Sequence, residues 1–120
     1  MQISIIGGGY VGLVSAACLA SLKHDVDLIE IDQTKVTIIR DGKSPIYENG
    51  LEELLQLYIN KNLNILTNYS NIINSDIIII CVGTPQDIDG KADLSIICSA
   101  AHSIGRALSE NANANTTYPI

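Results

Sequence analysis

Short apolar runs alternate with stretches of helical character from the first residues of the chain. Gln2–Ile6 is a short Ile-rich run, which is typical of a strand, and glycines separate it from the small, apolar stretch Tyr10–Leu22. Val26–Ile31 is a second β-branched run, and Asp32 is placed to cap a short helix that continues to Arg40. The pattern therefore predicts a strand, a helix, a second strand and a second helix in succession.

The middle of the chain combines turn residues with one amphipathic helix. A proline and an Asn-Gly pair mark residues 43–50 as a loop, and Leu51–Ile59 then has an apolar face opposite two glutamates. The residues of that face are Leu51, Leu54, Leu55 and Tyr58. Asn64–Leu66 predicts a weak strand, and Ser70–Asn74 predicts a helical turn.

The last third of the chain contains its most apolar strand signal. Asp76–Val82 has four isoleucines in a row, and we expect it to be the deepest strand, covered on both faces. A turn-rich loop follows over residues 83–92, and Asp93 is placed to cap a helix. The apolar positions of that helix repeat at helical spacing: Leu94, Ile97, Ala101, Ile104 and Leu108. Residues 111–120 form a polar tail, in which a fifth strand is missing or degenerate.

Alternating strands and helices predict parallel pairing through right-handed crossovers. The expected fold class is α/β, an open doubly wound parallel sheet of the Rossmann type, truncated after about four strands. The usual strand order, 3-2-1-4, places Asp76–Val82 at an edge, where free N–H and C=O groups offer a template to another strand. Either more chain follows there, or the domain associates as a homo-oligomer.

Composition and charge limit the classes of partner. The 120 residues, 47% of them hydrophobic, suit a single globular domain. Thirteen Asp and Glu against seven Lys and Arg give a net charge of −6, which repels phosphate polymers and anionic lipid surfaces. We therefore expect no nucleic-acid or membrane partner, and an anionic small molecule must be held by local dipoles or by one placed cation.

The first apolar stretch and the cysteines both bear on where the protein works. Ile3–Leu22 is long enough to span a membrane, but three consecutive glycines interrupt it and no basic residue precedes it. We expect a cytoplasmic protein without a targeting segment. The separated Cys18, Cys81 and Cys98 fit a reducing compartment and are interpreted as buried structural thiols. No metal site is predicted, because the aspartates between residues 87 and 93 lack the terminal glutamate of a calcium loop.

The glycine-rich turn after the first strand is the clearest chemical signal. Six residues satisfy the pattern G-x-G-x-x-G: Gly7, Gly8, Gly9, Tyr10, Val11 and Gly12. The motif follows a strand, opens a helix and precedes Glu30 by 18 residues. Gly7 permits a tight turn, Gly9 lets a diphosphate approach the backbone, and Gly12 lets the helix pack closely. Together with the positive end of the helix, this predicts dinucleotide binding by a domain of residues 1–110.

The residues after the second strand predict which dinucleotide binds. Glu30 is placed to accept hydrogen bonds from the adenosine ribose hydroxyls, and its charge would repel a 2′-phosphate, so NAD is favoured over NADP. Asp32 competes for that role, although it is also placed as a helix cap. Lys35 is either simply exposed, or it reaches back to the ribose or its phosphate.

Three separated segments carry a family resemblance. They are Gly9–Leu13, the run SPIYENGLEELL at 44–55 and the run VGTPQDIDGKADLS at 82–95. In this order they resemble the N-terminal domain of UDP-glucose 6-dehydrogenases and their nucleotide-sugar dehydrogenase relatives, over residues 1–108. The resemblance implies an enzyme that oxidises the C6 alcohol of a UDP-sugar to a carboxylate with two NAD, through a thioester on a cysteine, and that makes polysaccharide precursors.

The resemblance also implies where the cofactor is held. The first place is the turn Gly7–Gly12, with Glu30 where the family usually has Asp and with Lys35 in support. The second is the loop at the carboxyl end of the fourth strand, formed by Val82, Gly83, Thr84 and Pro85. In the tail, Thr117 is matched to a Ser-Thr-Val-Pro loop of the family.

The catalytic cysteine of the family, its Lys and Asn helpers and its sugar-binding helix belong to later segments, so no catalytic residue is assigned within these 120 residues. We expect the chain to contain an NAD-binding site and to be inactive toward UDP-glucose on its own. Two alternatives stay open. One is a nucleotide-sensing regulatory module of a transport system, and the other is the first domain of another NAD-dependent dehydrogenase, for hydroxy acids or glycerol phosphate.

Overall fold

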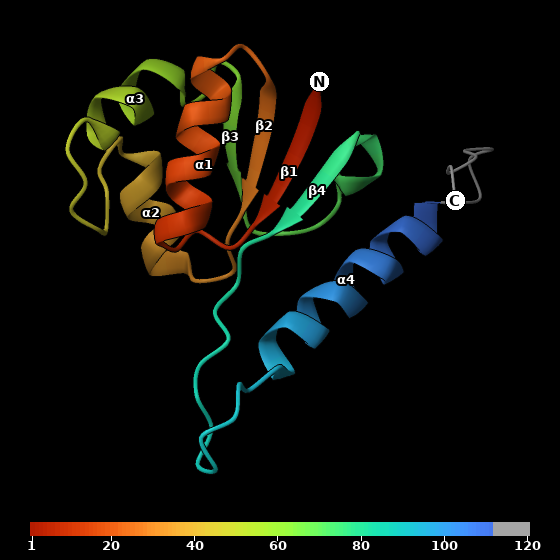
Figure 1. The fold of residues 1–120 in the computed structure, drawn as a ribbon. Coiled ribbons are helices and arrows are strands. Elements are labelled where there is room, and N and C mark those ends of the chain that lie inside the picture. Colours follow the sequence, from red (N-terminus) through yellow and green to blue (C-terminus); the bar gives the residue numbers. More distant parts are fainter. Residues whose placement is uncertain (112–120) are drawn as a thin grey trace.

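The structure is a computed structural model that describes residues 1–111. One sheet holds the strands β1 (Gln2–Ile6), β2 (Asp25–Ile29), β3 (Leu63–Leu66) and β4 (Ile77–Ile80). The helices, drawn in Figure 1, are α1 (Tyr10–Ser21), α2 (Gln33–Arg40), α3 (Leu51–Tyr58) and α4 (Ser95–Asn111), with a 3-10 turn, η1 (Ile72–Asn74). All strands pair in parallel in the order β3-β2-β1-β4, so the prediction of an open, doubly wound α/β sheet is confirmed.

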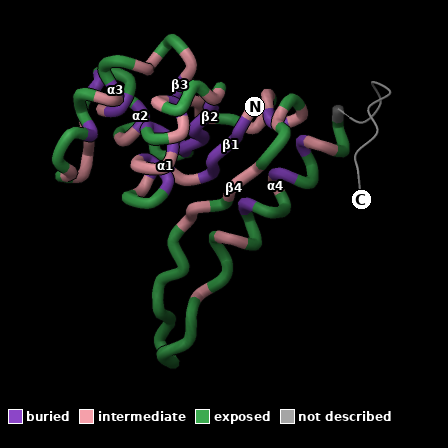
Figure 2. Tube along the Cα trace, turned by 45° about the horizontal axis from the view of Figure 1, so that its top comes forward, coloured by how far each residue is buried: buried purple, intermediate pink, exposed green. Residues whose placement is uncertain are grey.

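Two apolar layers lie on opposite faces of this sheet. The helices α1, α2 and α3 cover one face, and η1 and α4 lie on the other. Strand alternation produces the two layers, because Ile3 and Ile5 of β1 belong to the first core and Ile6 belongs to the second. Figure 2 shows the buried positions concentrated in the strands and in parts of the helices. The carboxyl ends of the strands meet at the end of the sheet where α1 begins (Figure 1).

Polar side chains fix both ends of α2. Asp32 Oδ1 accepts hydrogen bonds from the backbone N–H groups of Thr34, at 2.9 Å, and Lys35, at 3.4 Å, so the predicted cap is confirmed. At the other end the Arg40 guanidinium donates two hydrogen bonds to the carbonyl oxygen of Ile65, at 2.7 and 3.1 Å. The second pair of bonds ties α2 to β3 and holds the helix against the sheet.

The amphipathic helix α3 is confirmed with the face predicted for it. Leu51 and Leu55 are buried, and Leu54 and Tyr58 pack against the same core. Glu52 lies on the exposed side in the first turn of α3, where a carboxylate interacts favourably with the positive end of the helix dipole.

Strand β4 is the least buried strand of the sheet, so the prediction that it is the deepest and is covered on both faces is wrong. Ile77 and Ile80 are 43% and 36% exposed, whereas four of the five residues of both β1 and β2 are buried. The strand lies at the predicted edge, and the main partner of α4 on this side is η1. A run of isoleucines indicates a strand but not which elements cover it. The pairing of this edge with a further strand or a second copy stays a prediction.

The three cysteines are not the buried thiols that the sequence suggested. Cys18 and Cys98 are exposed, and Cys81 is half-buried, where burial raises the pKa of its thiol. The interpretation as buried thiols is therefore wrong. For Cys18 the reason lies in α1, whose residues show almost no separation into an apolar and a polar side, so that the sequence could not show which side of the helix faces solvent.

Helix α4 is confirmed, and its buried side agrees with the predicted one only in part, at Ile104 and Leu108. Asp93 accepts a hydrogen bond from the backbone N–H of Ser95 at 2.9 Å, close to the start of the helix. The helix buries small residues together with one isoleucine: Ala100, Ile104 and Ala107. Leu94, which was predicted to lie on the buried side, is 54% exposed. Alanines allow α4 to approach η1 closely, and this contact decides which side of the helix turns inward.

A buried carboxylate, Asp27, lies in the middle of β2 and is 1% exposed. Its oxygens accept hydrogen bonds from the side-chain amides of Gln2, at 3.1 Å, Asn64, at 3.0 Å, and Asn71. These three residues come from β1, from β3 and from the segment before η1. The network therefore joins three parts of the fold through one ionisable group.

Replacing Asp27 with alanine is expected to lower the free energy of unfolding by about 2–4 kcal/mol, because three part-buried hydrogen bonds to its carboxylate are lost. Urea unfolding followed by circular dichroism measures this change. Asp25→Ala, at the exposed start of the same strand, is the matched control and should change the value by less than about 0.5 kcal/mol. Equal losses in the two variants would contradict the structural role of the network.

Candidate cofactor site

The turn between β1 and α1 is shaped by two glycines that packing requires. Gly7 has a φ of +106°, and its N–H donates a hydrogen bond of 2.8 Å to the carbonyl oxygen of Ile29. A Cβ on Gly7 would lie 2.7 Å from the carbonyl oxygen of Cys81, and a Cβ on Gly12 would lie 1.8 Å from the carbonyl oxygen of Gly7. The start of α1 is therefore pressed directly against the ends of β1 and β4.

Gly9 differs from these two glycines because the space beside it is empty. It is the residue before α1, with a φ of −76°, and a Cβ added to it would meet no atom of the described residues within 4 Å. Within residues 1–111 no side-chain hydrogen bond caps the start of the helix, and its first turn contains no acidic residue. Tyr10 and Val11 are exposed. The N-terminal amides of the helix can thus be approached closely by an anionic group.

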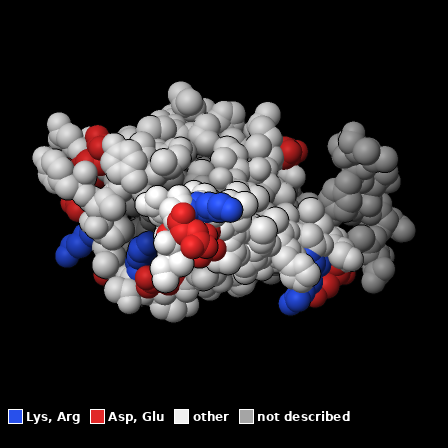
Figure 3. All heavy atoms as spheres, turned by 60° about the horizontal axis from the view of Figure 1, so that its bottom comes forward, with Lys and Arg blue, Asp and Glu red and all other residues white. Residues whose placement is uncertain are grey.

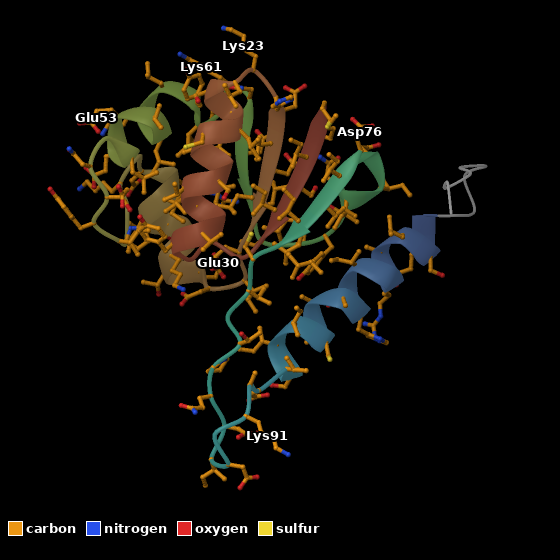
Figure 4. All side chains as sticks on the ribbon, in the orientation of Figure 1. Lys23, Glu30, Glu53, Lys61, Asp76 and Lys91 are labelled. Carbon is orange, nitrogen blue, oxygen red and sulfur yellow. The ribbon has the colours of Figure 1, made fainter. Side chains whose placement is uncertain are left out.

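The Glu30 carboxylate lies just after β2 and is bound to the glycine turn. It is 8% exposed, its Oε1 accepts a hydrogen bond of 3.0 Å from Gly8 N–H, and its Oε2 accepts one of 3.1 Å from Asp32 N–H. Lys35 Nζ stands 3.9 Å from Oε1, with 44% of the side chain exposed. Figure 4 shows Glu30 at the end of the sheet where the strands finish, opposite Lys23 and Lys61. Glycines and carboxylate therefore lie at the same end of the sheet.

A cavity of about 380 Å³ opens beside Glu30, between the ends of β1 and β2 and helix α4. Its walls include Ile6 and Ile29 from the ends of β1 and β2, and Val82 from the segment just after β4. A mainly apolar space with a carboxylate at its margin suits a flat heterocycle attached to a sugar. Gly7 also lines the cavity, which therefore continues into the glycine turn.

Several cavity residues were missed by reasoning from the sequence. Tyr69 lines the cavity from the segment after β3, and burial and the charge of Glu30 raise the pKa of its hydroxyl. Helix α4 contributes three serines, Ser95, Ser99 and Ser103. The serines recur every four residues, a spacing that marks one side of a helix and could have identified them. No comparable sequence pattern predicts that Tyr69 lines the cavity.

The second predicted cofactor loop is brought to the cavity only in part. Val82 is half-buried and lines the cavity. Gly83, Thr84 and Pro85 are exposed on the segment that leaves the sheet, and they are not among the cavity walls. Thr117 lies outside the described residues.

The charge around this end of the sheet is divided into small groups. Figure 3 shows separate clusters of acidic and basic atoms with uncharged surface between them. Within residues 1–111 there is no group of three or more His, Cys, Asp or Glu that could hold a metal ion. None of the helices described here is long and apolar enough to cross a membrane. The positive end of α1 and the ammonium group of Lys35 are the attractive features for an anion at this site.

Comparison with known sequences gives a consistent result. Residues 1–116 match the sequence model of the UDP-glucose/GDP-mannose dehydrogenase family, NAD binding domain. The chain is 43% identical to the UDP-glucose 6-dehydrogenase AglM of Haloferax volcanii over 108 residues, which are 90% of this chain and 25% of that protein. It is 45% identical to the GDP-mannose 6-dehydrogenase of Pseudomonas savastanoi pv. phaseolicola over 118 residues, which are 97% of this chain and 27% of that protein.

Comparison with solved structures extends the similarity to the fold. A ternary complex of GDP-mannose dehydrogenase from Pseudomonas aeruginosa superposes with a TM-score of 0.86 and 43% identity. The match covers 90% of this chain and 25% of that one. The chain therefore spans about a quarter of the length of these relatives.

Proposed function

Because the chain belongs to the UDP-glucose/GDP-mannose dehydrogenase family and matches its NAD binding domain, we propose that it is the cofactor-binding part of an enzyme that oxidises the C6 alcohol of a nucleotide sugar. The resemblance noted in the three sequence segments is confirmed, and NAD is the cofactor of this domain. Family membership replaces the two alternatives, a nucleotide-sensing regulatory module and the first domain of another NAD-dependent dehydrogenase. UDP-glucose is the first candidate substrate.

One observation supports the placement of NAD above all: the Glu30 carboxylate is bonded to Gly8 N–H, next to the open space at Gly9. The diphosphate lies against the start of α1, where the glycine turn leaves room for it. Glu30 accepts hydrogen bonds from the adenosine ribose, and Lys35 supports the carboxylate from α2. The adenine ring enters the cavity beside Tyr69. Bound NAD supplies an acceptor for two electrons from the alcohol carbon.

The remaining site residues belong to the same proposal. Val82 contacts the adenosine side from the segment just after β4, and Gly83, Thr84 and Pro85 continue toward the part of the cofactor beyond the diphosphate. Thr117 is assigned to the cofactor by resemblance alone. A GDP-sugar is the second candidate substrate, because the Pseudomonas savastanoi GDP-mannose 6-dehydrogenase is 45% identical over 97% of the chain.

The 120-residue chain should bind NAD but should not reduce it with UDP-glucose or GDP-mannose. Oxidation requires the alcohol carbon to be held in contact with the nicotinamide, and no residue of the proposed site is assigned to the sugar. Calorimetric titration measures NAD binding, and absorbance at 340 nm measures NADH formation. The Haloferax volcanii UDP-glucose 6-dehydrogenase, assayed beside it with UDP-glucose, is the positive control.

Both results of this experiment are informative. Turnover by the chain alone would mean that these residues also hold the sugar, which contradicts the proposed division of labour. Absence of NAD binding by a folded chain would contradict the proposed site itself.

A further inference from the structure

Tyr10 and Glu48 join two segments that are far apart in the sequence. Tyr10 is the first residue of α1, and its hydroxyl donates a hydrogen bond of 2.5 Å to Glu48 Oε2. Glu48 belongs to the loop of residues 43–50, between α2 and α3. The start of the proposed diphosphate site is thereby connected to a loop that contributes no wall to the adenosine cavity.

The loop holds Glu48 in place through its own bonds. The carbonyl oxygen of Glu48 accepts a hydrogen bond of 3.2 Å from Leu51 N–H. Ser44 N–H donates to Glu52 Oε1 at 3.1 Å, and the Ser44 hydroxyl bonds with the backbone of Ile46. Ile46 packs against the first core. The carboxylate therefore reaches Tyr10 from a loop that is anchored at both ends.

A carboxylate without a partner here would oppose an anionic cofactor. Gly9 has no side chain and the first turn of α1 has no acidic residue, so the helix amides are available. A nearby carboxylate is attracted to the same positive end of the helix as a diphosphate is. Among the described residues Glu48 has no ion-pair partner, since the one salt bridge found there joins Lys35 and Glu30. Its partner is instead the uncharged Tyr10 hydroxyl, which donates a hydrogen bond to the carboxylate.

We propose that Tyr10 is a positioning residue for cofactor binding, whose hydroxyl holds the Glu48 carboxylate at the tip of its side chain and so keeps the start of α1 free for the diphosphate. This inference rests on the proposed function only in placing the diphosphate at Gly9. The hydrogen bond to Glu48, and then the charge of Glu48, raise the pKa of Tyr10. The hydroxyl consequently stays protonated and remains the donor.

A double-mutant cycle on the NAD affinity of the whole chain tests this inference. Tyr10→Phe releases Glu48 and should weaken NAD binding about threefold to tenfold at low salt. Glu48→Gln should bind NAD at least as tightly as the unmodified chain. Adding Tyr10→Phe to Glu48→Gln should then cause no loss, because the competing charge is already gone.

Salt and a neighbouring tyrosine provide the controls. The loss in Tyr10→Phe should shrink in 1 M salt, where the screening length is about 3 Å. Tyr47→Phe removes the same hydroxyl from a side chain of the same loop that is 91% exposed, and it should leave NAD affinity unchanged.

Two outcomes would overturn the inference. One is an unchanged NAD affinity in Tyr10→Phe. The other is a loss that persists in the Glu48→Gln background and in 1 M salt, since a purely structural role of Tyr10 produces that result. Failure of the diphosphate placement is distinguished by Gly9→Ala, which would then bind NAD as well as the unmodified chain does.

Discussion

Gly12→Ala is expected to destabilise the domain strongly. The added Cβ would lie 1.8 Å from the carbonyl oxygen of Gly7 and 3.3 Å from Cys81 Cβ, so α1 would have to move away from the sheet. Forcing backbone apart in a packed interior costs about 3 kcal/mol or more. The free energy of unfolding of a small domain is about 5–15 kcal/mol in total. Thermal unfolding followed by circular dichroism should show a Tm lowered by about 10 °C or more.

Gly9→Ala and Gly105→Ala are the matched controls, because neither added Cβ would meet an atom of the part of the chain that the structure describes within 4 Å. Both variants should keep their Tm within about 4 °C of the unmodified chain. Gly9→Ala should nevertheless weaken NAD binding about tenfold or more, since the methyl group occupies the space of the diphosphate. An unchanged Tm in Gly12→Ala would contradict the close packing of α1 on the turn.

Glu30→Gln should weaken NAD binding about tenfold to a hundredfold, because hydrogen bonds to a charged acceptor contribute about 1.5–3 kcal/mol. The same change should reduce the preference for NAD over NADP, since the charge that repels a 2′-phosphate is removed. Glutamine keeps an oxygen that can accept from Gly8 N–H, so the turn retains its shape. Calorimetric titrations with NAD and with NADP measure both effects.

Asp32→Asn is the control for this experiment. Asp32 carries a similar charge two residues away, but its Oδ1 caps α2, and asparagine can provide the same cap. The ratio of NAD to NADP affinity should therefore stay close to that of the unmodified chain. A Glu30→Gln variant that still prefers NAD as strongly would show that this carboxylate does not select the cofactor.

The site offers a physical reason why a chain of net charge −6 can hold an anionic cofactor. Attraction comes from the open end of α1 and from Lys35, over short distances where the overall field matters less. The nearby carboxylates Glu30, Asp32 and Glu48 are each bonded to a donor of the protein, which is Gly8 N–H, Thr34 N–H and the Tyr10 hydroxyl respectively. Local dipoles therefore compensate for an unfavourable net charge.

The sequence by itself determined the strands and helices, their parallel order and the end of the sheet where Gly7–Gly12 and Glu30 meet. It could do so because these features depend on local patterns: apolar periodicity, a capping Asp32, and glycines at a strand-to-helix turn. The choice of family also followed from segments that are each continuous in sequence.

Only the tertiary structure decided which elements cover which. In the tertiary structure β4 is only partly covered, and Cys18 and Cys98 face solvent. Tyr69 lines the same cavity as Glu30. The tertiary structure also paired Tyr10 with Glu48, 38 residues away. The physical reason is common to all of these: an apolar run or a lone polar residue gains its partner from a distant segment, and packing rather than local periodicity chooses that partner.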